Sequence, residues 1–178
     1  MKQSVHFIAQ TGAVIAAFLL PASARAAEVS VDWPAGWTVS KLAAPSGSEG
    51  YRLRAILPGT NNKPLAVIEL TVLKRITSGN FNLPVEFHKV QDAMQQGFAQ
   101  LNATVSCTAS SQTSFGGLDA LETTCTAGKD GANFVKQVID IGGGSEHAYS
   151  LTYSASPNGF DEHLPPFVEV RAKLPALN

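Results

Sequence analysis

Apolar residues alternate with polar ones along several short segments of the chain, as they do in strands that bury one face. Residues 28–33 and 51–57 show this period of two, and residues 37–40 resume an extended path after a turn at residues 34–36. Residues 65–73 are rich in apolar and β-branched residues on both phases of the alternation. This run predicts a central strand covered on both faces.

A helical period replaces the alternation after residue 82. Leu83 and Pro84 open the predicted helix, and Glu86 lies near its positive end. Apolar residues then recur at steps of four, four and three: Val90, Met94, Phe98 and Leu101. This pattern predicts an amphipathic helix that docks one face on a sheet.

Four more strands are predicted in meander order, at residues 103–109, 118–126, 133–141 and 147–154. Glycines occupy the intervening turns at residues 114–117, 129–131 and 142–145, where a positive φ would favour them. The whole order predicts an α+β fold, an antiparallel meander sheet with helices packed on it.

A second helix is predicted near the C-terminus, starting at Asp161 or Pro165 and ending before Pro175. Asp161 is the candidate cap. The positions expected to face the sheet are Phe167, Val168, Arg171 and Leu174.

The first 26 residues have the features of a secretory signal peptide. Lys2 and His6 precede an apolar run at residues 7–20, Pro21 ends that run, and small residues follow, with cleavage favoured after Ala26. The run is shorter than the roughly 20 residues of a membrane-spanning helix, so the alternative of an N-terminal anchor is disfavoured. The sequence therefore predicts residues 1–26 as a signal peptide, residues 27–178 as one domain, and a periplasmic or secreted protein.

The net charge of the mature chain disfavours a nucleic acid as partner. Removal of Lys2 and Arg25 with the signal leaves 11 of the 13 basic residues against 14 acidic ones, a net charge of about −3. Nucleic-acid binding depends on clustered Lys and Arg, which this chain lacks. No second apolar stretch is long enough to span a membrane after signal cleavage.

Two cysteines in an exported chain are most simply one disulfide. The midpoint between Cys107 and Cys125 falls at Gly116-Gly117, the expected turn of that segment. Residues equidistant from a hairpin turn face each other, so the two cysteines are predicted to be cross-strand neighbours. A redox pair or a metal site fits less well, because the spacing is wrong and no further His or Cys lies nearby.

The order of elements resembles the α/β/α sandwich of the fold group that contains the photosystem accessory protein PsbP and the periplasmic protein DcrB. Four segments show the resemblance: residues 32–37 with their Trp-Pro-Ala-Gly-Trp sequence, 66–73, 115–120, and 148–153 followed by Phe160. The chain also resembles small exported proteobacterial proteins with an uncharacterised domain. The resemblance implies a non-enzymatic role, as an assembly factor, accessory subunit or chaperone.

The candidate chemical motifs all have simpler structural interpretations. No G-x-S-x-G elbow accompanies His88, His147 or His163. The run 161–163 and the pair His88 and Asp92 contain metal-ligand types, but a solvated helix start and a side-chain contact explain them better. The glycines at residues 142–144 lack the helix and Lys of a phosphate loop. We therefore expect no catalytic residue, no metal site and no cofactor.

Trp33 and Trp37 are the remaining candidates for a binding site. They lie four residues apart around a Pro-Ala-Gly turn, where packing in the core is the favoured interpretation. An exposed Trp would be a good anchor for a partner. Phe81, Phe115, Phe160 and Phe167 are likewise expected in the core or in loop packing.

The sequence thus predicts a non-catalytic periplasmic accessory or binding module whose partner is a protein of the envelope. One alternative is a chaperone-like adaptor that holds an apolar segment of a secreted protein on an open sheet face, which requires a large exposed apolar patch. The other alternative is a weak hydrolase or metal-dependent enzyme.

Overall fold

The computed structural model describes residues 28–60, 63–76 and 80–178. The predicted signal peptide, residues 1–26, lies outside the described residues.

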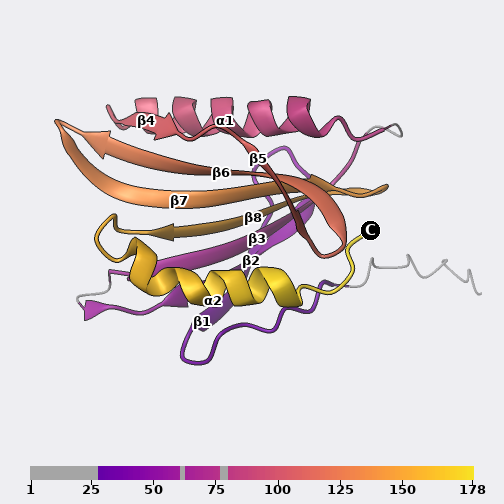
Figure 1. Cartoon of the computed structure of the whole chain (residues 1–178). Helices are drawn as coiled ribbons and strands as arrows, with labels where there is room; N and C mark the ends of the chain where they lie inside the picture. Colours follow the sequence, from indigo (N-terminus) through magenta and orange to yellow (C-terminus); the bar gives the residue numbers. More distant parts are fainter. Residues whose placement is uncertain (1–27, 61–62, 77–79) are drawn as a thin grey trace, which may run out of the picture.

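One antiparallel sheet organises the chain, in the spatial order β1-β2-β3-β8-β7-β6-β4, and β5 also pairs with β6 (Figure 1). The strands are β1 (Thr38–Ala43), β2 (Gly50–Leu57), β3 (Ala66–Lys74), β4 (Thr104–Cys107), β5 (Ser111–Phe115), β6 (Leu118–Lys129), β7 (Ala132–Gly143) and β8 (His147–Ala155). The helices are α1 (Leu83–Ala99) and α2 (Phe160–Lys173). The α+β class and the antiparallel sheet with packed helices are as predicted. The meander is interrupted where β3 pairs with β8.

The two helices cover opposite faces of the sheet. Along β7, Val138 packs in the core beneath α2, whereas the next residue, Ile139, packs beneath α1. The α2 core is the larger, and Tyr153 and Phe167 stack in it with ring centroids 5.6 Å apart. The α1 core is built around Phe87 and Cys125. Strands β6 and β7 therefore contribute alternate residues to two separate cores, which is the arrangement that the period of two requires.

The disulfide prediction is confirmed. Cys107 on β4 and Cys125 on β6 are directly opposite in the register and form a disulfide. Gly116 and Gly117 both have positive φ and form the turn between β5 and β6. The sequence analysis missed β5, because its residues, Ser-Gln-Thr-Ser-Phe, look like a polar loop.

Several finer predictions are wrong. Residues 28–33 form no strand. Leu101 lies beyond the end of α1 and is 63% exposed, and Val168 points outward from α2 at 44% exposed. The residue that caps α2 is Gly159, with no side-chain cap from Asp161.

The glycines after β7 have a different role from the predicted one. Gly142, Gly143 and Gly144 do not have positive φ. A Cβ added at Gly143 would overlap the ring of Phe81, so the absence of a side chain there allows this ring to lie directly on the strand. The glycine is thus a packing requirement, as Gly is where another group approaches the backbone closely.

Candidate functional site

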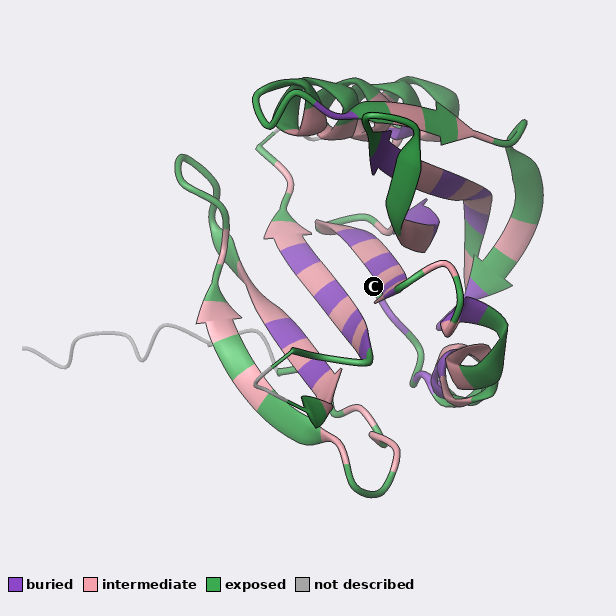
Figure 2. Cartoon of the chain, turned by 90° about the vertical axis from the view of Figure 1, so that its left-hand side faces the viewer, coloured by how far each residue is buried: buried purple, intermediate pink, exposed green. Residues whose placement is uncertain are grey.

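The face of the sheet on the α1 side is only partly covered. Helix α1 packs on β4, β6 and β7, and in the described part of the chain no helix packs on the same face of β1, β2, β3 and β8 (Figure 2). We call this region the open face. The burial of β3 corrects the prediction of a strand covered on both sides: Ile68 and Leu70 are fully buried beneath α2, whereas Val67, Glu69 and Thr71 on the other side are half-buried.

The strand register arranges the open face in rows. One row runs from Ser40 through Arg54, Glu69 and Thr152 to Ile139. The next row runs from Leu42 through Arg52, Thr71 and Ser150 to Ile141. Both rows are polar on β2, β3 and β8 and end beneath α1 at an apolar residue of β7, and the second row also begins with an apolar residue, Leu42.

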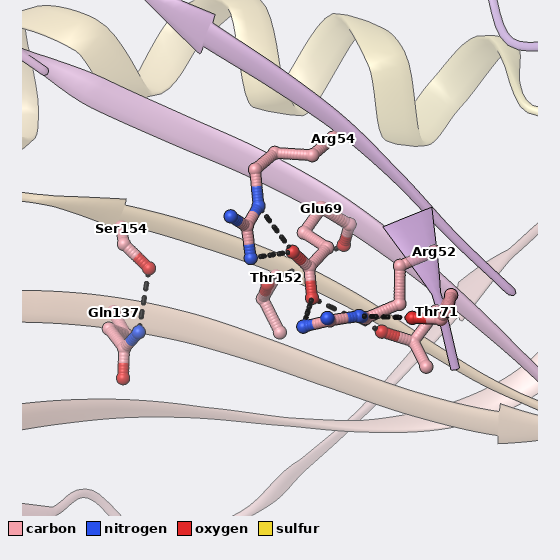
Figure 3. A network of polar contacts seen from close by, with 8 residues as sticks. Arg52, Arg54, Glu69, Thr71, Gln137, Thr152 and Ser154 are labelled. Atoms are coloured by element: carbon pink, nitrogen blue, oxygen red, sulfur yellow. Dashed lines mark hydrogen bonds and ion pairs between the residues drawn. The ribbon is translucent and has the colours of Figure 1, made fainter. Parts of the chain in front are cut away.

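A network of charged groups lies at the centre of the open face, with Arg54 and Arg52 on either side of Glu69 (Figure 3). Arg54 donates from Nε to Glu69 Oε2 over 2.6 Å, and Nη2 of the same guanidinium lies 2.6 Å from the same oxygen. Arg52 lies 3.6 Å from Glu69 Oε1 and donates from Nε to the carbonyl of Ala43. Two guanidinium groups thus share one carboxylate, and the network has a net charge of +1.

Hydroxyl and amide groups surround these charges. The hydroxyl of Thr71 donates to Glu69 Oε1 over 3.5 Å, and Gln137 donates to the hydroxyl of Ser154 over 2.6 Å (Figure 3). The side chain of Glu69 is 16% exposed, and those of Arg52 and Arg54 are 29% and 34% exposed. The centre of the open face is therefore polar, with hydrogen-bonding groups in fixed positions.

A groove of about 190 Å³ lies where the open face meets α1. Its walls are mostly apolar, and its lining residues include Leu73, Phe81, Val90, Ile141 and Ala148. At its rim, Lys89 pairs with Glu86 at 2.7 Å. Thr71 and Ser150 belong both to the groove and to the second row, so the groove and the charged network are continuous.

The sequence itself carries a signal for this site. Glu69 is the one charged residue in the otherwise apolar and β-branched run of residues 65–73. Arg52 and Arg54 occupy the outward phase of the preceding strand. Two cations and an acid on facing phases of neighbouring strands indicate a cross-strand pair, but only the register showed that they meet.

The two tryptophans lie on the opposite side of the sheet. Trp33 and Trp37 are half-buried and pack against the α2 core. Trp33 borders a pocket of about 280 Å³ together with Pro166 and Lys173 of α2. A role of these indoles in binding a partner stays a prediction. Four phenylalanines were expected in the core or in loop packing. Phe115, Phe160 and Phe167 are buried, and Phe81 is half-buried in the groove wall.

The described residues contain no group of three or more His, Cys, Asp and Glu that could hold a metal ion. His88 is exposed on α1, and Asp161 lies 3.9 Å from Lys136. Over the same ranges, none of the helices has the length and apolar character needed to cross a bilayer.

A second charged cluster lies beneath α2. Asp140 on β7 is fully buried, directly opposite Glu122 on β6, and Arg171 of α2 contacts both carboxylates, at 3.4 Å in the case of Asp140. Among the residues that the structure describes, none forms a hydrogen bond with Asp140 Oδ1. Burial, together with the nearby carboxylate of Glu122, raises the pKa of Asp140 from its ordinary 3.8 to about 7, against the lowering effect of Arg171. Arg171 thus joins α2 to the sheet through a buried charge.

Residues 28–175 match a family model described as a domain of unknown function, DUF4946. The chain belongs to the DUF4946 family. The match spans nearly all of the described residues, so the DUF4946 domain includes both helices and every strand of the sheet. Comparison with curated protein sequences gives no match.

Among solved structures, the DUF4946 domain is similar to LpqN of Mycobacterium tuberculosis, described as involved in cell envelope biogenesis. The TM-score is 0.53 at 15% sequence identity, over 82% of this chain and 80% of LpqN. At this identity the likeness concerns the fold alone. The finer resemblance to PsbP and DcrB stays a prediction.

Proposed function

We propose that this DUF4946 protein is a non-catalytic accessory module of the bacterial envelope that binds a protein partner with its open face. The observation behind the proposal is the open face itself. On four adjacent strands, half-buried hydroxyl, carboxylate and guanidinium groups lie on a face where none of the described helices covers them. Such a surface keeps its own structure and still has hydrogen-bonding groups for a partner.

The proposed location is the periplasm. The predicted signal peptide, the disulfide between Cys107 and Cys125, and the envelope role of LpqN all agree with a protein that works outside the cytoplasm. The role of LpqN is evidence by analogy of fold, which is a weak indication of function by itself. The absence of catalysis is part of the proposal and rests on the sequence motifs alone.

The adaptor alternative has one observation in its favour, the apolar groove beside α1. The rest of the open face is polar around Arg52, Arg54 and Glu69. A surface of this kind does not offer the large apolar patch that a holder of unfolded apolar segments needs. We therefore favour binding of one specific partner.

The proposal predicts that a bulky side chain on the open face abolishes capture of the partner. Ser150→Trp places an indole between the groove and the charged network. Thr124→Trp is the matched control, because Thr124 is also a half-buried strand residue but lies on the α2 side, opposite Val138. Tagged wild-type protein and both variants are used as bait in envelope extract, and co-purified proteins are quantified by mass spectrometry.

We expect at least one protein that wild type and Thr124→Trp capture equally and that Ser150→Trp loses by about tenfold, the effect of 1.4 kcal/mol. Thermal melts of all three baits show whether each is folded. Equal capture by folded Ser150→Trp would show that the partner does not use the open face.

A further inference from the structure

We infer that the partner presents an extended segment with two anchors, an acidic side chain at Arg52 and Arg54 and an apolar side chain, four residues further on, in the groove beside α1. This inference rests on the proposed function and specifies the chemistry of the partner. Three independent features of the open face lead to it: its charge, the size of the groove and the distance between the two subsites.

The charged network has capacity for a further anion. Each guanidinium has five N–H donors. Arg54 directs two nitrogens at Glu69, and Arg52 has one donor on the carbonyl of Ala43 and one nitrogen 3.6 Å from Glu69. The remaining donors belong to side chains that are about a third exposed, and the network has one cation in excess. A carboxylate is the group that a guanidinium fork binds best in a protein partner.

The size of the groove decides between a small molecule and a protein side chain. Pockets that hold a small molecule enclose roughly 300–1,000 Å³, whereas this groove has about 190 Å³. Its apolar walls, formed by Leu73, Phe81 and Ile141 among others, fit one large apolar side chain. The ion pair of Glu86 and Lys89 at the rim is neutral overall and does not repel an acidic segment.

The register fixes the distance between the two subsites. Arg52, Thr71, Ser150 and Ile141 are consecutive members of one row, on β2, β3, β8 and β7. Three steps between neighbouring strands span about 14 Å. An extended chain covers roughly 3.3–3.6 Å per residue, so a side chain that reaches Ile141, at the far wall of the groove, stands four positions after the acidic anchor. Thr71 and Ser150 lie between Arg52 and Ile141 and also line the groove, and their hydroxyls can hydrogen-bond to the backbone of the segment.

The first test uses the wild-type protein and a synthetic peptide as probe. The peptide acetyl-Glu-Ser-Gly-Ser-Phe-amide has the two anchors at the inferred spacing. Two control peptides replace Glu by Gln or Phe by Ala. Amide chemical shifts of isotope-labelled protein are followed during titration to several millimolar.

We expect the first peptide to shift the amides of Thr71, Ala148 and Ser150, and each control peptide to bind about fivefold more weakly, the effect of losing about 1 kcal/mol. If the three peptides shift the same amides with equal affinity, or if none shifts them, the inference is overturned.

The second test uses the captured partner and variants of the protein. Ala93→Phe fills the groove from α1, and its control is Ala99→Phe, because both alanines are exposed on this helix but only Ala93 lines the groove. Arg52→Gln removes a cation, and its control is Lys129→Gln, at an exposed cation on the far end of β6. We expect Ala93→Phe and Arg52→Gln to weaken capture about fivefold or more and the controls to leave it unchanged.

The two proposals fail in different ways. If Ser150→Trp abolishes capture while Arg52→Gln and Ala93→Phe leave it at the wild-type level, the open face binds its partner by other contacts and only the present inference is overturned. If Ser150→Trp has no effect, the proposed function itself is wrong.

Discussion

Replacement of Arg171 by Met is expected to lower the free energy of unfolding by about 3–5 kcal/mol at pH 8, the cost of leaving a buried charge without its partner. Asp140 is fully buried and lies opposite Glu122, and Arg171 is the cation that contacts both. Met keeps most of the length and apolar contact of the Arg side chain. The decrease in the free energy of unfolding therefore measures the contribution of the Arg171 charge, which joins α2 to the sheet. Urea unfolding of wild type and variant gives its value.

The effect of this substitution depends on pH in a direction that follows from Asp140. The pKa of this group is about 7 in the folded protein and near 3.8 when unfolded, so between these values the folded state binds more protons than the unfolded state. The contribution of Asp140 to stability is thus greatest below pH 4 and falls as the pH rises through 7. For Arg171→Met we expect a much smaller loss at pH 5, where Asp140 is protonated, than at pH 8.

Asp140→Asn is the control for this assignment. Asn has no charge to desolvate and can donate to Glu122 while it accepts from Arg171. We expect the free energy of unfolding of Asp140→Asn to change less between pH 5 and pH 8 than that of the wild type. An unchanged pH profile in Asp140→Asn, or a loss in Arg171→Met that is the same at both pH values, would show that this cluster does not titrate in this range.

Removal of the disulfide is expected to cost about 3 kcal/mol, the chain-entropy value for a loop of this size. Cys107 and Cys125 connect β4 to β6 at the edge of the sheet beneath α1. Cys107→Ala combined with Cys125→Ala avoids a free thiol. Thermal unfolding of this double variant, with oxidised wild type as reference, measures the loss.

Loss of the disulfide is also expected to loosen α1 before the rest of the fold, because Cys125 belongs to the α1 core and not to the α2 core. Hydrogen exchange followed residue by residue should therefore speed up in β4 and α1 more than in β3 and β8. A uniform increase across the sheet, or no loss of stability, would contradict this account of the disulfide.

Local patterns predicted the elements that depend on local physics. Pro84 and the apolar steps of residues 90–98 located α1, the period of two located β2, and the run rich in apolar and β-branched residues located β3. The position of Gly116-Gly117 midway between the cysteines predicted their cross-strand pairing correctly. In each case the determining interactions lie within a few residues or across one turn.

The open face was not predictable by the same means, because it depends on which strands α1 covers. The run of residues 65–73 looked like a strand covered on both sides, yet α1 packs further along the sheet and leaves Glu69 and Thr71 half-buried. The pairing of β3 with β8 joins residues about eighty positions apart. Arg52 and Ile141 belong to one row across the sheet, but without that register the sequence does not show that they lie near each other.

The central claim, that the open face is the binding surface, is tested most directly by photocrosslinking in cells that produce the protein naturally. A benzophenone amino acid is placed at Thr38 or Ser40 on the open face, or at Val168 on α2 and Asp92 on α1 as exposed controls. We expect the same partner protein to crosslink from Thr38 and Ser40 and from neither control position. Crosslinks to that partner from Val168 or Asp92, with none from the open face, would contradict it.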